Sequence, residues 1–404
     1  MKIVQINSVY GYGSTGKIVK DIHHQLISQN FESYVFYGRG KKSTESSVFK
    51  FVGLIGNILD LLYTKLFSKH GLTNKIATRR LLKKLDSISP DIIHLHNIHG
   101  YYINYPMLMN YCQKKTIKVV WLLHDQWVIS GSSAYFDEDI NWEDITLDEV
   151  RQYQKKYPKS IFTNFAIVKK NYELKKHLLT NKDITFVTPS KWLMDVLKSS
   201  YLANERIEVI YNGINTEIFK PRKNSSKDSD KITILGVANI WNKRKGLHHF
   251  NKLADDLPSN FEIKIIGKMH SQEESIHPRI NYIERTDSSE KLAELYSNAD
   301  VFVNTSNIDN FPTTIIEAQA CGTPVITFDT GGSSESIIDS TGYVISKDNY
   351  DELLSLLKKI PKKNYDTEFA CRENSMKYDR DVMISNYIKL YEEERHKNEK
   401  NNNI

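Results

Sequence analysis

The sequence predicts an α/β protein built from two Rossmann-like domains with parallel sheets. Its 404 residues exceed what one hydrophobic core usually serves. Short apolar runs rich in β-branched residues recur, each followed by a loop and a helical pattern, as in the βα units of a parallel sheet. This rhythm ends at a polar stretch and then restarts, so we expect a second domain of the same architecture.

The predicted strands form two series. The first comprises residues 3–6, 92–95, 119–123, 185–188 and 207–210, and the second comprises residues 232–237, 262–266, 301–304 and 324–328. Between them, residues 221–231 are polar and alternate in charge, which is typical of a linker. We therefore predict a first domain (1–220), a linker (221–230), a second domain (231–378) and a terminal helix (379–404) that can pack back on the first domain, with a frayed tail.

Charge and cysteine content narrow the class of protein. The net charge of +6 suggests an anionic partner such as a phosphate ligand or a lipid surface. No feature of the sequence indicates nucleic-acid binding. The cysteines Cys112, Cys321 and Cys371 are far apart and lack CxxC spacing, which argues against disulfides and a zinc site. We recognise no signal peptide and no run of 18 apolar residues, so we expect a cytoplasmic protein.

The most informative segment is residues 306–337. It follows a predicted strand and continues as a helix from about Thr314 to Gly322, which is suited to cap the helix C-terminus. The backbone N–H groups of Phe311, Thr313 and Thr314 would then lie at a helix N-terminus, where an anion or a sugar hydroxyl is bound well. The segment therefore indicates a phosphate or sugar site.

Two carboxylates belong to this segment. Asp309 precedes the helix and Glu317 lies one turn inside it, and carboxylates accept paired hydrogen bonds from vicinal diols. A nucleotide sugar combines such diols with a phosphate that a helix N-terminus attracts. The alternative is that Asp309 only caps the helix and Glu317 is a solvated surface residue. Against it, Glu317 sits among small and apolar residues, where an unpaired carboxylate would be costly.

This segment resembles the signature of glycosyltransferase family 4. Members of that family have the GT-B fold, in which two Rossmann-like domains face each other across a cleft, and retain the anomeric configuration of the donor sugar. The resemblance implies that Asp309, where Glu is commoner, contacts donor-sugar hydroxyls and that Glu317 holds the nucleotide ribose. It also implies donor-site roles for Phe311, Pro312, Thr313 and Thr314. The matching positions are Asp309, Phe311, Pro312, Glu317, Ala318, Ala320, Cys321, Gly322, Pro324 and Val325.

Three further segments, residues 122–127, 188–193 and 210–221, resemble the same family. The first places His124 directly after a predicted strand, and ligands of open parallel sheets bind beyond the carboxyl ends of strands. The resemblance implies that His124 contacts the donor sugar. From the residues alone, a hydrogen-bonded structural histidine is an equal alternative.

The segment WNKRKGL, residues 241–247, follows the first strand of the second domain. Its cations Lys243, Arg244 and Lys245 could stabilise a diphosphate that leaves with two negative charges. A solvated basic loop is the alternative. The resemblance implies a catalytic role for Lys245, whereas Asn239, which we expect to be a donor-binding residue, stands near the position of the family's usual Arg. Either Arg244 substitutes for that arginine, or its role is absent.

The N-terminal stretch GYGSTGKI satisfies the first part of a P-loop pattern. Ile18, however, occupies the position where Ser or Thr must hold magnesium, so an ATPase is not expected. Gly13, Ser14 and Gly16 instead resemble the Gly-rich loop with which the family's first domain approaches the donor phosphates and the acceptor.

No metal cofactor is expected. The sequence contains the Asp-x-Asp pattern, with which many other glycosyltransferases bind a metal ion, at residues 137–139, 228–230 and 379–381. None of these acidic matches follows an apolar strand, so we interpret them as solvated. Three histidines alternate near one strand without the acidic or cysteine partner that would complete a metal site; they are His94, His96 and His99.

Residues 51–84 predict a membrane-surface contact. FVGLIGNILDLLYTKLF carries apolar residues on more than one helical face, but Asn57, Asp60 and Lys65 make it too polar and too short to span a bilayer. A run of Lys and Arg follows up to Lys84, and anionic lipid headgroups would attract it. A buried core helix with a solvated basic neighbour is the alternative.

The resemblance to glycosyltransferase family 4 implies a retaining hexosyltransferase of surface polysaccharide synthesis. The expected partners are a nucleotide-sugar donor, a glycan or lipid-linked oligosaccharide acceptor, and the anionic inner face of the cell membrane, with no nucleic acid. The expected catalytic residues are His124, Asp309, Lys245 and Arg244. Two alternatives are a GT-B nucleotide-sugar epimerase, which would need no acceptor, and a non-catalytic nucleotide-sugar-binding subunit, which would not hydrolyse the donor.

Overall fold

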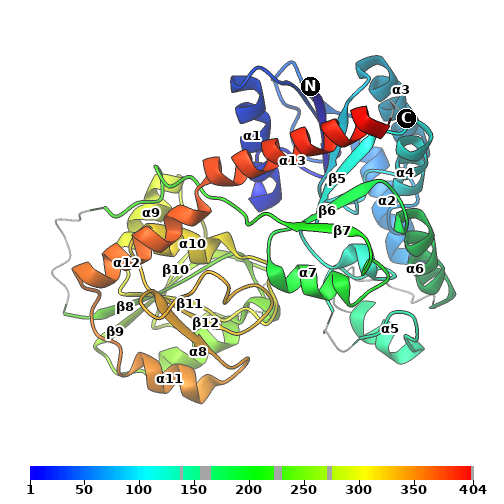
Figure 1. Ribbon diagram of the computed structural model, residues 1–404. Coiled ribbons are helices and arrows are strands. Elements are labelled where there is room, and N and C mark those ends of the chain that lie inside the picture. The colour runs from blue at the N-terminus through cyan, green and yellow to red at the C-terminus, as the bar shows by residue number, and fades with distance from the viewer. Residues whose placement is uncertain (137–139, 155–164, 223–229, 271–274, 402–404) are drawn as a thin grey trace. The chain divides into compact units, whose positions relative to one another are not determined.

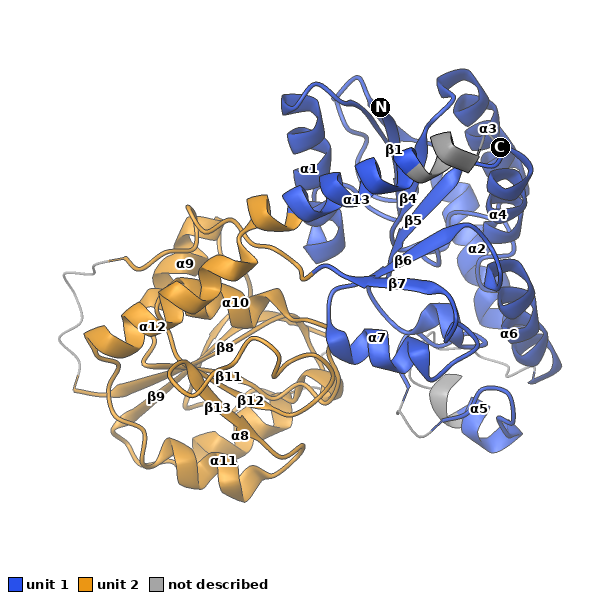
Figure 2. Ribbon diagram, in the orientation of Figure 1, with its two compact units in different colours: residues 1–210, 384–404 blue, residues 211–383 orange. Residues whose placement is uncertain are grey.

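The computed structural model describes residues 1–136, 140–154, 165–222, 230–270 and 275–401 (Figure 1). The chain divides into two compact units (Figure 2). The first comprises Met1–Ile210 with Ile384–Ile404, and the second comprises Tyr211–Met383. Each unit has its own sheet of parallel strands, which confirms the predicted α/β class with two Rossmann-like domains.

The first unit is built on a sheet with the order β3-β2-β1-β4-β5-β6-β7, in which every pairing is parallel. Its strands are β1 (Lys2–Asn7), β2 (Glu32–Tyr37), β3 (Val48–Lys50), β4 (Ile92–Leu95), β5 (Lys118–Leu122), β6 (Ile184–Thr188) and β7 (Arg206–Val209). The helices are α1 (Gly13–Ser28), α2 (Leu54–Phe67), α3 (Lys75–Ile88), α4 (Tyr105–Lys114), α5 (Leu147–Gln154), α6 (Phe165–Leu179) and α7 (Lys191–Lys198), with the 3-10 helix η1 (Trp127–Ile129).

The second unit has the strand order β10-β9-β8-β11-β12-β13, again parallel throughout. Its strands are β8 (Ile232–Trp241), β9 (Phe261–Met269), β10 (Ile280–Ile283), β11 (Val301–Asn304), β12 (Val325–Phe328) and β13 (Gly342–Ile345). The helices are α8 (Leu247–Asp256), α9 (Ser289–Asn298), α10 (Thr313–Ala320), α11 (Tyr350–Leu357) and α12 (Tyr365–Ser375), with the 3-10 helices η2 (Lys243–Lys245) and η3 (Met376–Tyr378).

Helices cover both faces of the second sheet, with α9, α10 and α12 on one side and α8 and α11 on the other (Figure 1). Neighbouring residues of β8 show how the strand serves both layers. Ile234 packs in the cluster that contains α8 and α11, while Leu235 packs in the cluster that contains α9 and α10. Strands buried on both faces read as continuous apolar runs, which is why they could be found in the sequence.

The strands that the sequence analysis did not predict are β2, β3, β10 and β13. Three of them are at the sheet edges, where a strand is short and only partly buried: β3 has three residues, and β10 and β13 have four each. Edge strands need less apolar sequence than central ones, so their signal is weaker. The inner strand β2 was missed although its residues ESYVFY are mostly buried.

The terminal helix α13 (Arg380–Asn401) groups with the first unit from Ile384 onward. The Tyr391 hydroxyl lies 2.6 Å from Nδ1 of His94 on β4, and the Thr185 hydroxyl on β6 donates to Glu394 at 3.1 Å. Residues 211–220, which the sequence analysis assigned to the first domain, group with the second unit. Residues 223–229 of the predicted linker and 402–404 of the predicted frayed tail lie outside the described residues.

Two further expectations concern the chain as a whole. Cys112, Cys321 and Cys371 are buried and free, so they form no disulfide. Among the described residues, no helix combines the length and apolar character needed to cross a bilayer.

Candidate functional site

The candidate site of the second unit begins at the end of β8. The pairing of β8 with β9 shifts register between Val237 and Ile240, and Asn239 is exposed at this irregularity. Beyond the strand, the Asn242 side chain accepts a hydrogen bond from the Lys245 backbone N–H at 3.0 Å and so caps η2. The cations of η2 are thereby held in a single short turn directly after the strand.

The structure brings three of the predicted catalytic residues together. Lys245 Nζ forms an ion pair with Asp309, and Arg244 donates from Nη1 to the Ile308 carbonyl at 2.8 Å. The Asn307 N–H donates to the Arg244 carbonyl, also at 2.8 Å. The turn after β8 is therefore bound to the loop after β11, beyond the carboxyl ends of two neighbouring strands, where open α/β sheets bind ligands.

Asp309 is held as a carboxylate. Burial acts to raise the pKa of its carboxyl group, but the charges of Lys245 and Arg244 and the N–H of Asn310 at 3.1 Å hold that pKa below its usual value. The loop after β12 closes over its backbone, because the Gly332 N–H donates to the Asp309 carbonyl at 3.0 Å. Gly331 has a positive φ of 58°, and a Cβ there would lie 1.9 Å from the same carbonyl oxygen, so only glycine fits.

Helix α10 begins without a side-chain cap. Its N-cap residue is Pro312, which makes no cap hydrogen bond, so Asp309 does not cap the helix as the alternative interpretation supposed. Thr313 and Thr314 form the first turn and are partly exposed. Phe311 is buried, and its ring packs on Tyr211 at a centroid distance of 4.9 Å, so its side chain belongs to the core.

Glu317 lies one turn further along α10 and contacts a different element. The Tyr296 hydroxyl on α9 donates to its Oε2 at 3.1 Å, and the Glu317 side chain is partly exposed. Asp309 and Glu317 are thus anchored on opposite neighbours, η2 and α9. The helix ends as predicted near Gly322, whose φ of 77° is suited to the residue after a helix C-cap.

In the first unit, His124 lies two residues after β5. Its ring stacks on His96 at a centroid distance of 5.7 Å and an angle of 16°. Burial lowers the pKa of His124 to about 4, although Asp125 acts to raise it, so the ring is neutral at pH 7. A neutral imidazole at this position can accept or donate one hydrogen bond but cannot supply positive charge.

The other histidines near β4 have structural partners. His96 Nε2 lies 3.1 Å from Gln5 Oε1, and His99 Nε2 lies 2.9 Å from Asp125 Oδ2, while His94 contacts Tyr391 as described above. One ring nitrogen of each of these histidines therefore interacts with a protein group.

The Gly-rich stretch of the first unit forms the start of α1. Gly13 has a φ of 66° and open space where a Cβ would be, and Ser14 is exposed. Gly16 is buried, and a Cβ there would lie 3.1 Å from the Val9 side chain and 3.2 Å from the Gly11 N atom. Gly13 and Ser14 are therefore accessible at a helix N-terminus, whereas Gly16 is buried and closely packed.

Of the acidic matches, only residues 379–381 are described completely; 137–139 and 228–229 lie outside the described residues. Asp379 Oδ1 accepts from the Asp381 N–H at 2.7 Å, and the Thr216 hydroxyl donates to Asp379. Asp379 thus connects the start of α13 to the segment before β8, which is a structural role.

Helix α2 buries polar residues and exposes apolar ones, the reverse of the usual arrangement on a globular protein. Its buried residues are Asp60 and Thr64, whereas its large apolar side chains are exposed; these are Leu54, Ile55, Ile58, Leu59, Leu62, Tyr63, Leu66 and Phe67. The interpretation of this segment as a buried core helix is therefore wrong. In α3, the basic residues Lys75, Arg79, Arg80, Lys83 and Lys84 are all exposed.

The sequence analysis did not predict two features of the second unit, the contact of Gly331 with Asp309 and a cluster of two histidines with an aspartate. Gly331, which closes over Asp309, is in the segment that we singled out, but its role depends on a contact across 22 residues. His248, His249 and Asp348 form a cluster whose only local signal is the adjacent histidine pair, because Asp348 is 99 residues away from His249 in the chain.

Comparison with known proteins gives matches along most of the chain. Residues 15–218 match the family model described as Glycosyltransferase Family 4, and residues 217–378 match the model described as Glycosyl transferases group 1. WcaC of Escherichia coli strain K12, a glycosyl transferase named for colanic acid biosynthesis, is 24% identical over 97% of this chain and 100% of its own length.

A second relative matches only in part. The N,N'-diacetylbacillosaminyl-diphospho-undecaprenol alpha-1,3-N-acetylgalactosaminyltransferase of Campylobacter jejuni is 25% identical over 42% of this chain and 46% of its own length. Among solved structures, Anabaena HepE in complex with UDP-glucose matches with a TM-score of 0.67 at 13% identity, over 97% of this chain and 100% of that one. The structural likeness confirms the predicted GT-B fold.

Proposed function

The chain belongs to glycosyltransferase family 4, and on that premise we propose that it transfers a sugar from a nucleotide sugar to a lipid-linked glycan, with retention of configuration and without a metal ion. The observation that carries the proposal is the binding of Lys245 and Arg244 to the Asp309 loop beyond the strand ends of the second unit. The alternatives of an epimerase and a non-catalytic subunit find no support, since both relatives by sequence are named as transferases.

A nucleotide sugar suits the second unit because its diphosphate and its hydroxyls each have a partner there. Lys245 and Arg244 supply two positive charges in the turn bound to the loop before α10, and the N-terminus of a helix favours an anion. Glu317, one turn further, would accept paired hydrogen bonds from the ribose diol. HepE, which shares the fold, is known in complex with UDP-glucose, and this supports the same class of donor.

The proposed retention comes from the family resemblance and requires no dedicated general base, and the cluster described is compatible with it because Asp309 is poorly suited to that role. Asp309 is paired with Lys245 and its pKa is lowered, which makes it a weak base. We therefore propose that the acceptor hydroxyl approaches on the face that the phosphate leaves. The bond between the anomeric carbon and the phosphate oxygen breaks, the acceptor oxygen bonds to that carbon, and the departing phosphate takes the acceptor proton.

Protein cations replace a metal ion in this proposal. Lys245 and Arg244 can stabilise the negative charge that develops on the leaving diphosphate, a role that a divalent cation has in other transferases. Among the described acidic pairs, Asp379 and Asp381 are engaged at the start of α13 rather than at a strand end.

A lipid-linked acceptor is supported by one relative and by one surface. The Campylobacter enzyme is named for an acceptor on diphospho-undecaprenol. Helix α2 exposes eight large apolar side chains, and soluble monomers rarely expose apolar patches of more than a few hundred Å² without a function. The exposed cations of α3 would be attracted to anionic headgroups, and this supports our proposal that the enzyme works at the inner face of the membrane.

The decisive experiment is product analysis. Thermal-shift screening of UDP, GDP and ADP sugars identifies the donor, because binding stabilises the folded state. NMR of the product made with a lipid-linked acceptor should then show the anomeric configuration of the donor, with and without EDTA. An inverted product contradicts retention. Activity that disappears in EDTA and returns with magnesium or manganese contradicts the metal-free mechanism.

A further inference from the structure

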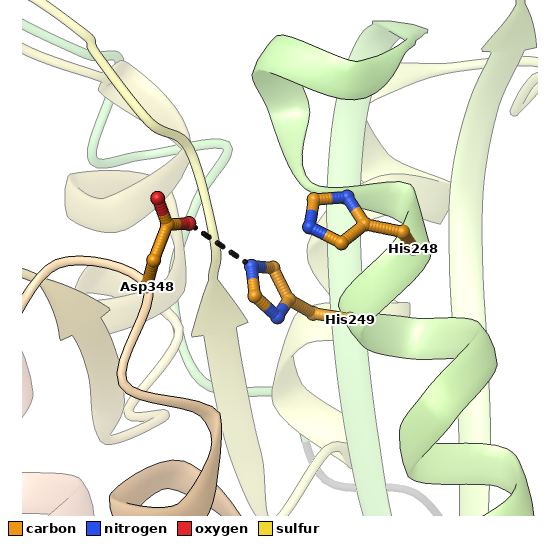
Figure 3. A group of neighbouring side chains, drawn as sticks. All are labelled: His248, His249 and Asp348. Atoms are coloured by element: carbon orange, nitrogen blue, oxygen red, sulfur yellow. Dashed lines mark hydrogen bonds and ion pairs between the residues drawn. The ribbon is translucent and has the colours of Figure 1, made fainter.

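Three potential metal ligands of the second unit converge between the start of α8 and the loop after β13. Figure 3 shows the rings of His248 and His249 side by side on α8, with Asp348 opposite them in the loop between β13 and α11. One ligand atom from each residue lies within 4.8 Å of the other two. This is the metal-competent group found in the part of the chain that the structure describes.

The geometry of one edge of this triangle already suits a metal ion. His249 Nε2 lies 3.3 Å from Asp348 Oδ1. In a tetrahedral zinc site with bond lengths of about 2.0–2.1 Å, ligand atoms are separated by about 3.3 Å. His248 must approach by rotation of its side chain, and because this side chain is exposed, the rotation meets little resistance.

The buried histidine is fixed in orientation. The His249 ring packs edge-on against Phe328 at a centroid distance of 5.0 Å and is nearly parallel to the Tyr350 ring at an angle of 12°. Tyr350 is itself held by a 2.7 Å hydrogen bond from its hydroxyl to Asp256. Support of this kind orients a ligand before the metal arrives and reduces the entropy lost on binding.

The protonation states also suit coordination. Burial lowers the pKa of both His248 and His249, so both rings carry a lone pair at pH 7. Lys243 contributes to the lowered pKa of His248, and Lys252 to that of His249, and the same positive charges oppose a bound cation. The affinity should therefore be lower than that of structural sites with four protein ligands.

We propose that His248, His249 and Asp348 bind a divalent cation of the zinc class and fasten the start of α8 to the loop before α11. Two imidazoles and one carboxylate favour Zn²⁺, Co²⁺ or Ni²⁺ over Mg²⁺ and Ca²⁺, which prefer oxygen ligands. Coordination through Nε2 of His249 replaces its hydrogen bond to Asp348. The proposal does not rest on the function proposed above.

The test is isothermal titration of the chelator-treated full chain with zinc chloride. The variants His248→Ala and Asp348→Asn each remove one exposed ligand and leave the buried ring in place. His277→Ala is the matched control, because His277 Nε2 also lies near a carboxylate, 3.1 Å from Asp255, but belongs to no group of three potential ligands among the described residues. We expect one zinc site in the native chain, at least tenfold weaker in either ligand variant and unchanged within twofold in the control.

Two results would overturn the proposal. One is zinc binding of the native chain that is no tighter than that of Asp348→Asn. The other is an equal loss of affinity in His277→Ala, which would show general surface binding. A thermal-shift measurement gives a second reading, since zinc should raise the unfolding temperature of the native chain and of His277→Ala more than that of the ligand variants. None of these readings depends on transferase activity.

Discussion

Helices α10 and α2 bury opposite kinds of side chain. Helix α10 turns Ile315 and Ile316 into the core of the second unit and leaves Glu317 partly exposed. Helix α2 buries Asp60 in the first unit and exposes Ile58. The hydrophobic effect accounts for the first arrangement directly, whereas in the second, polar contacts must hold the helix while its large apolar side chains stay exposed. A periodic pattern of apolar residues in a sequence therefore predicts that a helix has an apolar face, but not whether that face is buried or exposed.

Polar contacts hold α2 on the first unit. The Asn57 side chain donates to the Tyr101 carbonyl at 2.9 Å, and the Asn74 side chain donates to the Asp60 carboxylate at 2.6 Å. Burial raises the pKa of Asp60 to about 6, against hydrogen bonds that lower it, which shows the cost of placing a carboxylate there. These contacts explain how the helix stays docked with its apolar residues outside.

The strongest test of this comparison is the same substitution in both helices. Ile315→Ser should destabilise the protein by about 2–5 kcal/mol, the range for truncation of a buried isoleucine, because it leaves a cavity and a buried hydroxyl. Ile58→Ser should change the free energy of unfolding by no more than about 0.5 kcal/mol, because the side chain is 46% exposed. Urea denaturation of both variants measures the difference; equal destabilisation would mean that α2 packs inward.

The sequence predicted α10 and its surroundings well because the evidence there is local. A buried strand, a loop, a helix and its C-terminal glycine follow one another within residues 301–322, and the cation turn of η2 follows its own strand directly. The direction of α2 could not be predicted, since it depends on partners such as Tyr101 that are far along the chain. The ion pair between Lys245 and Asp309 could not be predicted from the spacing of residues either, because 64 residues separate the two in the sequence.

The second prediction concerns the ion pair between Lys245 of η2 and Asp309. Lys245→Met should lower the turnover number about 10²–10³-fold, as expected when one group that stabilises developing negative charge is lost. The Michaelis constant for the donor should change less, because the diphosphate gains charge only as it leaves. Steady-state kinetics measure both. Lys243→Met, in the same turn but exposed, is the control and should stay within a few-fold of the native enzyme.

The third prediction concerns the exposed acid of α10. Glu317→Gln should weaken donor binding by about 1.5–3 kcal/mol, the range for hydrogen bonds to a charged group, because an amide cannot accept two hydrogen bonds from a diol. Tyr296→Phe controls for a purely structural effect, since it removes only the hydroxyl that donates to Glu317. A donor Michaelis constant that is unchanged in Glu317→Gln, or that rises equally in Tyr296→Phe, would assign Glu317 to structure.

The last prediction sharpens the role of the exposed face of α2 through the charges that follow it. Anionic lipid attracts each basic residue near its surface by about 1 kcal/mol, or about fivefold in affinity. The double variant Arg79→Gln and Arg80→Gln should therefore sediment less with anionic vesicles at low salt, while Lys358→Gln with Lys359→Gln, an exposed pair directly after α11, should not. Substitution of Leu54 and Ile58 by Ser should release the protein further without unfolding it, because both side chains are exposed.

Negligible binding of the native chain to anionic and neutral vesicles alike would leave the apolar face for a protein partner. Binding that depends on Arg79 and Arg80 but not on Leu54 and Ile58 would mean that charge alone brings the enzyme to the lipid.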